Sequence, residues 1–79
     1  MTISKSPTLR YRILVVGTLD ANWSECLGGL TIDVHQQTDA PPITELSGPL
    51  ADQAALHGVL NTLFMLNLPV LLVERTSET

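Results

Sequence analysis

The sequence predicts an α+β domain in which a four-stranded antiparallel sheet packs against one long helix. Three observations predict this class: segments in which apolar residues alternate, an apolar stripe at helical spacing, and a short apolar run after a proline. The stretch from Gln53 to Val73 is the most informative, because it carries no formal charge and His57 is its only titratable residue. It is expected to form one helix followed by one buried strand.

The first strand is expected from Leu9 to Thr18. Its far end is apolar on both faces, which is typical of a central strand. A short helical segment of one or two turns should follow between Asp20 and Gly29. Asn22 is its expected N-cap, and the pair of glycines that begins at Gly28 would end it.

A hairpin is expected next. Leu30 to His35 alternates apolar and polar residues, which predicts a half-buried strand with one solvated face. The residues from Thr38 to Pro42 are of types that favour a turn, and Ile43 to Leu50 should be the returning strand. Gly48 and Pro49 are expected to end that strand.

The main helix is expected to begin at the N-cap Asp52 and to end at Asn67, because Pro69 forbids continuation. Its apolar stripe follows the i, i+3, i+4, i+7 spacing of a helix that covers a sheet. The stripe consists of Leu56, Val59, Leu60 and Leu63. The last strand, Val70 to Arg75, has apolar residues on both faces and is expected to be covered on both sides.

The order strand, short helix, strand, strand, long helix, strand resembles the ferredoxin-like plait, in which two helices cover one face of a four-stranded antiparallel sheet. The link between the first two strands is close to the minimum for a crossover. A three-strand meander followed by the same helix and strand therefore stays open. A single domain is expected over residues 9–76, with flexible termini at 1–8 and 77–79.

Composition narrows the class of protein. The chain has 79 residues and a net charge of −4, and its four cations are spread along the sequence, which argues against a nucleic-acid partner. Cys26 is the only cysteine, so no intramolecular disulfide can form. The N-terminus lacks the apolar core of a secretory signal, and no apolar window is long enough for a bilayer. A cytoplasmic protein without membrane contact is expected.

From Tyr11 to Arg75 the chain resembles a family of small, uncharacterised bacterial proteins. The resemblance is carried by Trp23, by Leu68-Pro69 and above all by a segment that starts at Leu46 and reads Leu-x-Gly-Pro-x-x-Asp-Gln-Ala-Ala-Leu-His-Gly. The resemblance implies a fold class but no activity. Members of that family usually have charged residues where this chain has Phe64 to Asn67. The outer helix surface, which is exposed to water in those proteins, is therefore expected to be covered in this one.

The outer face of the helix is the strongest candidate for a functional surface. It comprises Ala54, Gly58, Asn61, Phe64 and Met65. Small residues at i and i+4 let a second helix approach closely, and a glycine in mid-helix costs about 0.8 to 1 kcal/mol relative to alanine, which a contact should offset. The sequence therefore predicts a homodimer or higher oligomer formed through this face. The open face of the sheet is a second candidate, and cover by the chain's own termini or loops is a third.

A small-ligand sensor is the alternative function, with a metabolite bound at the dimer interface near His57, Gln53 and Arg12. His57 has no second catalytic group placed beside it by the sequence, so a non-enzymatic protein without cofactor is expected. Cys26 is expected to be a small buried residue beside its neighbour Leu27.

The remaining polar residues are expected to have structural roles. Arg10 and Arg12 should pair across strands with Asp33, His35 or Glu45. A metal site built from Asp33 and His35 with His57 or Cys26 is disfavoured, because no close set of three ligands is indicated.

Overall fold

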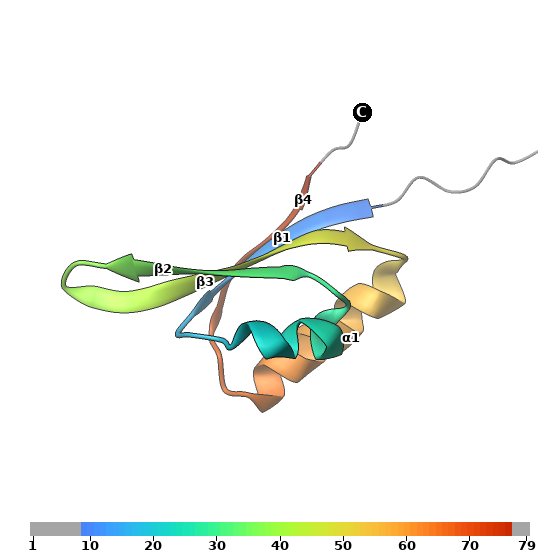
Figure 1. The fold of residues 1–79 in the computed structure, drawn as a ribbon. Helices are drawn as coiled ribbons and strands as arrows, with labels where there is room; N and C mark the ends of the chain where they lie inside the picture. Colours follow the sequence, from blue (N-terminus) through green and yellow to red (C-terminus); the bar gives the residue numbers. More distant parts are fainter. Residues whose placement is uncertain (1–8, 77–79) are drawn as a thin grey trace, which may run out of the picture.

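The computed structural model describes residues 9–76, and both predicted flexible termini lie outside that range. The elements follow the predicted order (Figure 1). They are β1 (Leu9–Val16), the 3₁₀ helix η1 (Ala21–Leu27), β2 (Thr31–Gln37), β3 (Ala40–Leu50), α1 (Gln53–Met65) and β4 (Val70–Thr76).

The described strands form one four-stranded sheet in the order β2-β3-β1-β4, with every neighbouring pair antiparallel. The connection from β1 to β2 passes over β3, and the connection from β3 to β4 passes over β1. Both crossovers belong to the plait, whereas a meander would have paired β1 with β2. The predicted plait-like arrangement is therefore confirmed, with η1 in the place of the first helix.

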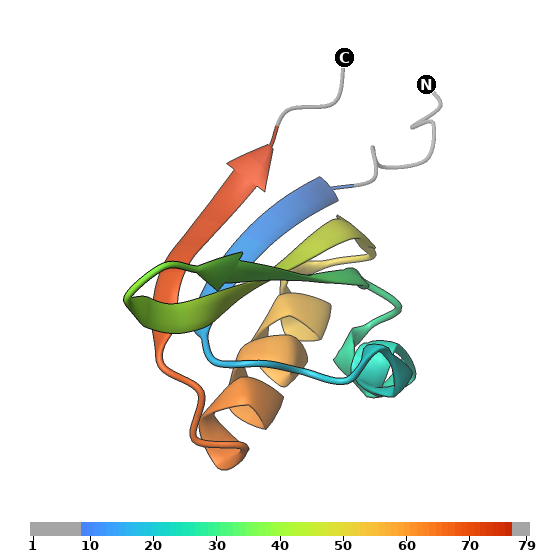
Figure 2. The ribbon, with the colours of Figure 1, turned by 60° about the vertical axis from the view of Figure 1, so that its left-hand side comes forward.

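Helices α1 and η1 cover the same face of the sheet and leave the other face open (Figures 1 and 2). In Figure 2, η1 lies toward β2 and α1 lies toward β4. The core lies between these two layers. Its buried apolar side chains are Tyr11, Ile13, Val15, Leu19, Leu27, Leu30, Leu46, Leu50, Val59 and Leu63.

The central strands supply the middle of the core. Ile13 of β1 lies opposite Leu46 of β3, and both side chains are fully buried. Thr44 is also fully buried, and its hydroxyl donates a hydrogen bond of 2.6 Å to the carbonyl oxygen of Gly17. That bond satisfies the hydroxyl group, whose unpaired burial would be costly.

The prediction for the main helix is confirmed. Asp52 is the N-cap, and its carboxylate accepts a 2.9 Å hydrogen bond from the backbone N–H of Ala55. Val59 and Leu63 of the stripe are buried, while Leu56 and Leu60 are half-buried at its edges. Asn67 takes the expected left-handed conformation (φ 61°) after the helix.

The predicted N-cap of the short helix was wrong. Asp20, not Asn22, caps η1, because its carboxylate accepts the backbone N–H of Asn22 at 2.9 Å. The segment winds as a 3₁₀ helix, and Gly28 ends it in the left-handed conformation (φ 70°), as expected. In this tighter helix Leu27 takes the buried position.

The hairpin differs from the prediction at both ends of β3. Its turn is only Thr38 and Asp39, so Pro41 and Pro42 lie inside the strand. The strand also continues through Gly48 and Pro49 to Leu50.

Position 49 tolerates proline because β2 pairs with β3 only as far as Ser47, which leaves that edge of β3 without a neighbour in the described chain. Gly48 has φ 144°, and a Cβ there would lie 3.3 Å from Leu30 Cδ2. A glycine therefore lets Leu30 pack directly on β3.

The expectation that the last strand is covered on both faces was wrong. β4 is an edge strand beside β1, and Leu71, Leu72 and Val73 are exposed. The sequence pattern indicated burial, but the helical layer lies mainly under the centre of the sheet. In a single chain this apolar strand therefore faces solvent.

Candidate functional site

The outer face of α1 is presented to solvent over its whole length. All five predicted contact residues are exposed: Ala54, Gly58, Asn61, Phe64 and Met65. Phe64 is 65% exposed and Met65 is 75% exposed, the largest fractions among the large apolar side chains of residues 9–76. Within residues 9–76, no loop or strand covers this face. The five residues that the sequence predicted therefore share one exposed surface.

Two shallow hollows run along the flank of α1 that carries Phe64. The first has a volume of about 470 Å³ and is lined by His57, Leu60, Asn61 and Phe64. The second has a volume of about 240 Å³ and is lined by Phe64, Asn67, Leu68 and Pro69. Phe64 is common to both, so the two hollows join the middle of the helix to the loop that leads into β4. His57 lies in this apolar surface, at the edge of the first hollow.

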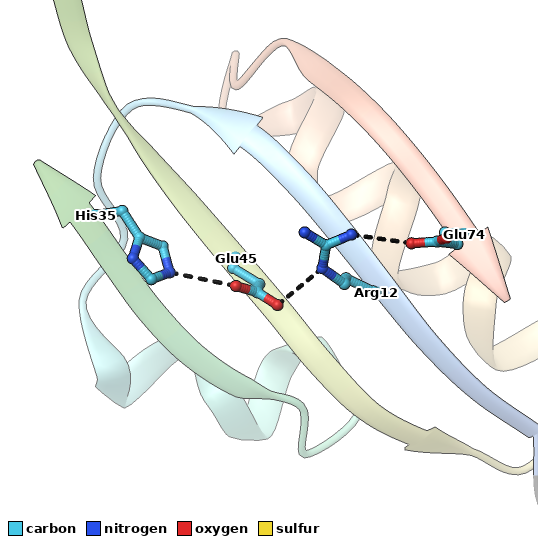
Figure 3. A network of polar contacts seen from close by, with 4 residues as sticks. All are labelled: Arg12, His35, Glu45 and Glu74. Carbon is cyan, nitrogen blue, oxygen red and sulfur yellow. Dashed lines mark hydrogen bonds and ion pairs between the residues drawn. The ribbon is translucent and has the colours of Figure 1, made fainter. Parts of the chain in front are cut away.

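An ion-pair network crosses the open face of the sheet (Figure 3). Arg12 Nε donates to Glu45 Oε2 at 3.0 Å, and Arg12 Nη1 donates to Glu74 Oε1 at 2.9 Å. His35 Nε2 lies 3.2 Å from Glu45 Oε1. Each of the four strands contributes one side chain, so the network links both edge strands to the centre of the sheet.

The network further stabilises the charged form of Arg12. Hydrogen bonds to Glu74, and then to Glu45, raise the pKa of the Arg12 guanidinium above its ordinary value. An arginine is charged at any ordinary pH, and this one already binds two carboxylates of its own chain. Its role in the folded chain is to link strands, which confirms the expected cross-strand pair with Glu45.

The three candidate ligand residues do not come together within one chain. Arg12 alternates with the buried residues Tyr11 and Ile13, so its side chain lies on the open face of the sheet. Gln53 and His57 lie on α1, against the other face. A site that uses all three would need contributions from more than one chain.

The expected burial of Cys26 was wrong, because its thiol is exposed. It lines a shallow hollow of about 240 Å³ with Asp20, Asn22 and Trp23. The 3₁₀ winding of η1 turns the neighbouring Leu27 into the core and leaves Cys26 outside. The same winding leaves Trp23 partly exposed.

The residues considered for a metal site are also separated. Asp33 and His35 lie on β2, and His35 already contacts Glu45. Cys26 and His57 lie on the two helices, on the other side of the sheet. Within residues 9–76 there is no group of three or more His, Cys, Asp or Glu side chains that could hold a metal ion.

Two features of these surfaces were missed in the sequence. One is Glu74, which the plait places beside Arg12 because β4 adjoins β1. The other is the exposed apolar edge of β4, which has the same sequence pattern as a buried strand. The strand order of the plait is the signal that could have revealed both features, since it makes β4 an edge.

A family model matches residues 10–74, and its description is domain of unknown function DUF8691. The chain belongs to this family. No curated protein and no solved structure gives a significant match to the chain. Between residues 9 and 76, no helix is both long enough and apolar enough to cross a membrane.

Proposed function

We propose that this chain is a non-enzymatic module that associates with itself through the outer face of α1, in the cytoplasm of a bacterium. The observation that carries the proposal is the exposed, uncharged surface that includes Phe64 and Met65. Soluble monomers seldom expose large contiguous apolar patches, and such patches commonly mark contact sites. The exposed Cys26 thiol suits a reducing compartment.

The composition of α1 supports a contact on this side. A surface helix of a small monomer normally carries charged residues on its outer face, and α1 carries none from Gln53 to Met65. Asn61 lies at the centre of the outer face, directly opposite the buried stripe. A partner there would meet small or apolar side chains and one neutral amide, so no charge would have to leave water.

The open face of the sheet is less suited to the contact. Its centre holds Arg12, Glu45 and Glu74, which already pair with one another. Burying these charges under a partner would remove them from water, and the desolvation cost can exceed the attraction between them. The helix face carries no such cost.

A small-ligand sensor is a second candidate function. The hollow of about 470 Å³ beside His57 favours it, because its volume is in the range of small-molecule sites and its lining combines apolar side chains with an imidazole and an amide. A ligand there should raise the unfolding temperature. A thermal-shift screen with common anions, amino acids and nucleotides that finds no stabilisation would exclude this candidate.

Light scattering after size exclusion tests the proposed self-association. At tens of micromolar the chain should have twice the single-chain mass of 8.6 kDa. Asn61→Arg places a charge at the centre of the outer face and should yield the single-chain mass. Gln36→Arg is the matched control, because Gln36 is exposed on β2, and it should leave the dimer intact. A wild-type chain that stays monomeric would refute the proposal.

A further inference from the structure

We infer that two copies of this chain join along their β4 edges, so that two antiparallel β4 strands pair across a two-fold axis and the two sheets become one. The inference rests on the proposed self-association and assigns it to one side of the molecule, the side of β4. On that side the exposed edge strand and the Phe64 flank of α1 form one surface.

The two edges of the sheet differ in how well they are protected from pairing. β2 carries Asp33, His35 and two glutamines, and polar or charged side chains discourage pairing with another strand. β4 instead begins with four apolar residues in a row, Val70 to Val73. Only β4 therefore combines an unpaired edge with an apolar surface in the described chain.

The exposed apolar side chains are concentrated on the same side. Of the seven large hydrophobic residues exposed in residues 9–76, five lie at the end of α1 or in β4. These are Phe64, Met65, Leu71, Leu72 and Val73. Met65 lies about 100° around the helix from Phe64, beside Gly58, so a contact on the β4 side would use the other four residues. If a fully exposed side chain of this size presents about 150–200 Å², the exposed fractions of those four amount to roughly 350 Å².

That area is a substantial share, though less than half, of what a stable contact requires. A standard interface buries about 800 Å² on each partner. The backbone edge of β4 and the hollow beside His57 and Leu60 would supply the remainder. A second copy fits this surface because its own β4 is both the apolar strand and the unpaired edge that the contact needs.

The helix and the edge strand are continuous at Phe64. This side chain lines the hollow that also contains Leu68 and Pro69, the residues that lead into β4. Gly58 lies about 120° around the helix from Phe64, at about 100° per residue. The small residues Ala54 and Gly58 would thus lie outside a contact centred on β4.

Two backbone hydrogen bonds show which way the groups of β1 point. Gly17 N–H donates to Pro42 O on the β3 side at 2.8 Å, and Val16 N–H donates to Pro69 O on the β4 side at 2.9 Å. Backbone groups in a strand alternate between its two neighbours. The even-numbered residues of β1 therefore point their N–H and C=O groups toward β4.

The same alternation identifies the free groups of β4. Leu72 and Glu74 lie opposite even-numbered residues of β1, so their backbone groups point toward β1. Val73 and Arg75 therefore direct their N–H and C=O groups away from the sheet. These outward groups are the ones that a second β4 strand would bind.

Charge disfavours registers of that pairing that are shifted toward the C-terminus of β4. With Val73 opposite its own copy, the outward groups of both strands meet, and Glu74 lies opposite Leu72 of the second strand. A shift of the two-fold centre by one residue toward the C-terminus would set Glu74 against Glu74, and a shift by two in that direction would set Arg75 against Arg75. Like charges directly opposite one another destabilise a strand pair. The register centred on Val73 avoids both repulsions.

Two valines provide a matched test of this contact. Val73 on β4 is 41% exposed and Val34 on β2 is 39% exposed, and both side chains project toward the helical side of an edge strand. Light scattering at tens of micromolar should give the single-chain mass for Val73→Lys and twice that mass for Val34→Lys. Far-UV circular dichroism of each variant shows whether it has folded.

Cross-linking gives a second measurement that does not introduce a charge. In a Cys26→Ser background, Val73→Cys should form a covalent dimer on mild oxidation, because opposite residues in a hydrogen-bonded pair have Cα atoms about 5.5 Å apart, within disulfide range. Val34→Cys should remain largely monomeric under the same conditions. This measurement decides the question even where Val73→Lys does not fold.

The outcomes separate this inference from the proposed function. A dimer that keeps its mass in Val73→Lys, forms no Val73→Cys cross-link and dissociates in Gly58→Arg would overturn the β4 contact while self-association stands. A wild-type chain that is monomeric, with no cross-link above the Val34→Cys level, would overturn both. Dissociation of Val73→Lys together with an efficient Val73→Cys cross-link would establish the edge contact.

Discussion

Replacing Gly58 with alanine should stabilise the folded chain. Gly58 lies in the middle of α1. Apart from its two chain neighbours and the adjoining backbone of its own helix, no atom of residues 9–76 lies within 4 Å of the place its Cβ would occupy. The new methyl group meets open space, so the helix gains the full propensity difference of about 0.8 to 1 kcal/mol. In a domain of this size that corresponds to a rise in Tm of about 4–8 °C.

The assay is thermal unfolding followed by circular dichroism, at a concentration low enough for the chain to be monomeric. Gly29→Ala is the matched control, because its Cβ also meets open space in the described chain but its φ is +79°. There a side chain is strained, and stability should fall by about 1 kcal/mol. A Gly58→Ala chain with an unchanged or lower Tm would refute the reasoning, since it would mean that a Cβ at this position is not free.

Three further experiments test other parts of the structure. Leu63→Ala removes a fully buried side chain and should lower the free energy of unfolding by about 2–5 kcal/mol in urea titrations; a loss below about 1 kcal/mol would contradict that burial. Asp52→Ala removes the cap of α1 and should lower the free energy of unfolding by about 1 kcal/mol, whereas Asp52→Asn should keep most of that stabilisation. Equal losses of stability in the two variants would argue against capping. Cys26 should react with a thiol reagent in the folded chain about as fast as in denaturant, and protection from the reagent would show that η1 packs differently.

Local patterns were sufficient to predict most of the fold. The spacing from Leu56 to Leu63, the cap at Asp52 and the left-handed Asn67 are short-range features, and each one predicts its own conformation. The succession of elements favoured the plait but left a three-strand meander open, and the structure decides between them by pairing β1 with β3 and β4. The errors in conformation fell at the ends of segments, where a single residue determines the boundary. At the start of η1, for example, Asp20 is the N-cap in place of the predicted Asn22.

The solvent exposure of side chains was harder to predict than the secondary structure. An apolar run such as that in β4 has the same pattern in a buried central strand and in an exposed edge strand, so Leu71 and Val73 were assigned to the interior. Cys26 was misplaced because a 3₁₀ helix presents a different set of side chains from an α-helix. The outer face of α1 was located correctly, since helical spacing alone separates Phe64 and Met65 from the buried stripe.

The mass of the wild-type chain in solution tests the central claim most directly. Sedimentation equilibrium over a concentration series from below one micromolar to about a hundred micromolar measures that mass without a reporter or a substitution. Reversible association toward twice 8.6 kDa, or a larger whole multiple, is the expected result. A constant mass of one chain across the whole series would contradict the claim, because Phe64, Met65 and the apolar part of β4 would then remain in water.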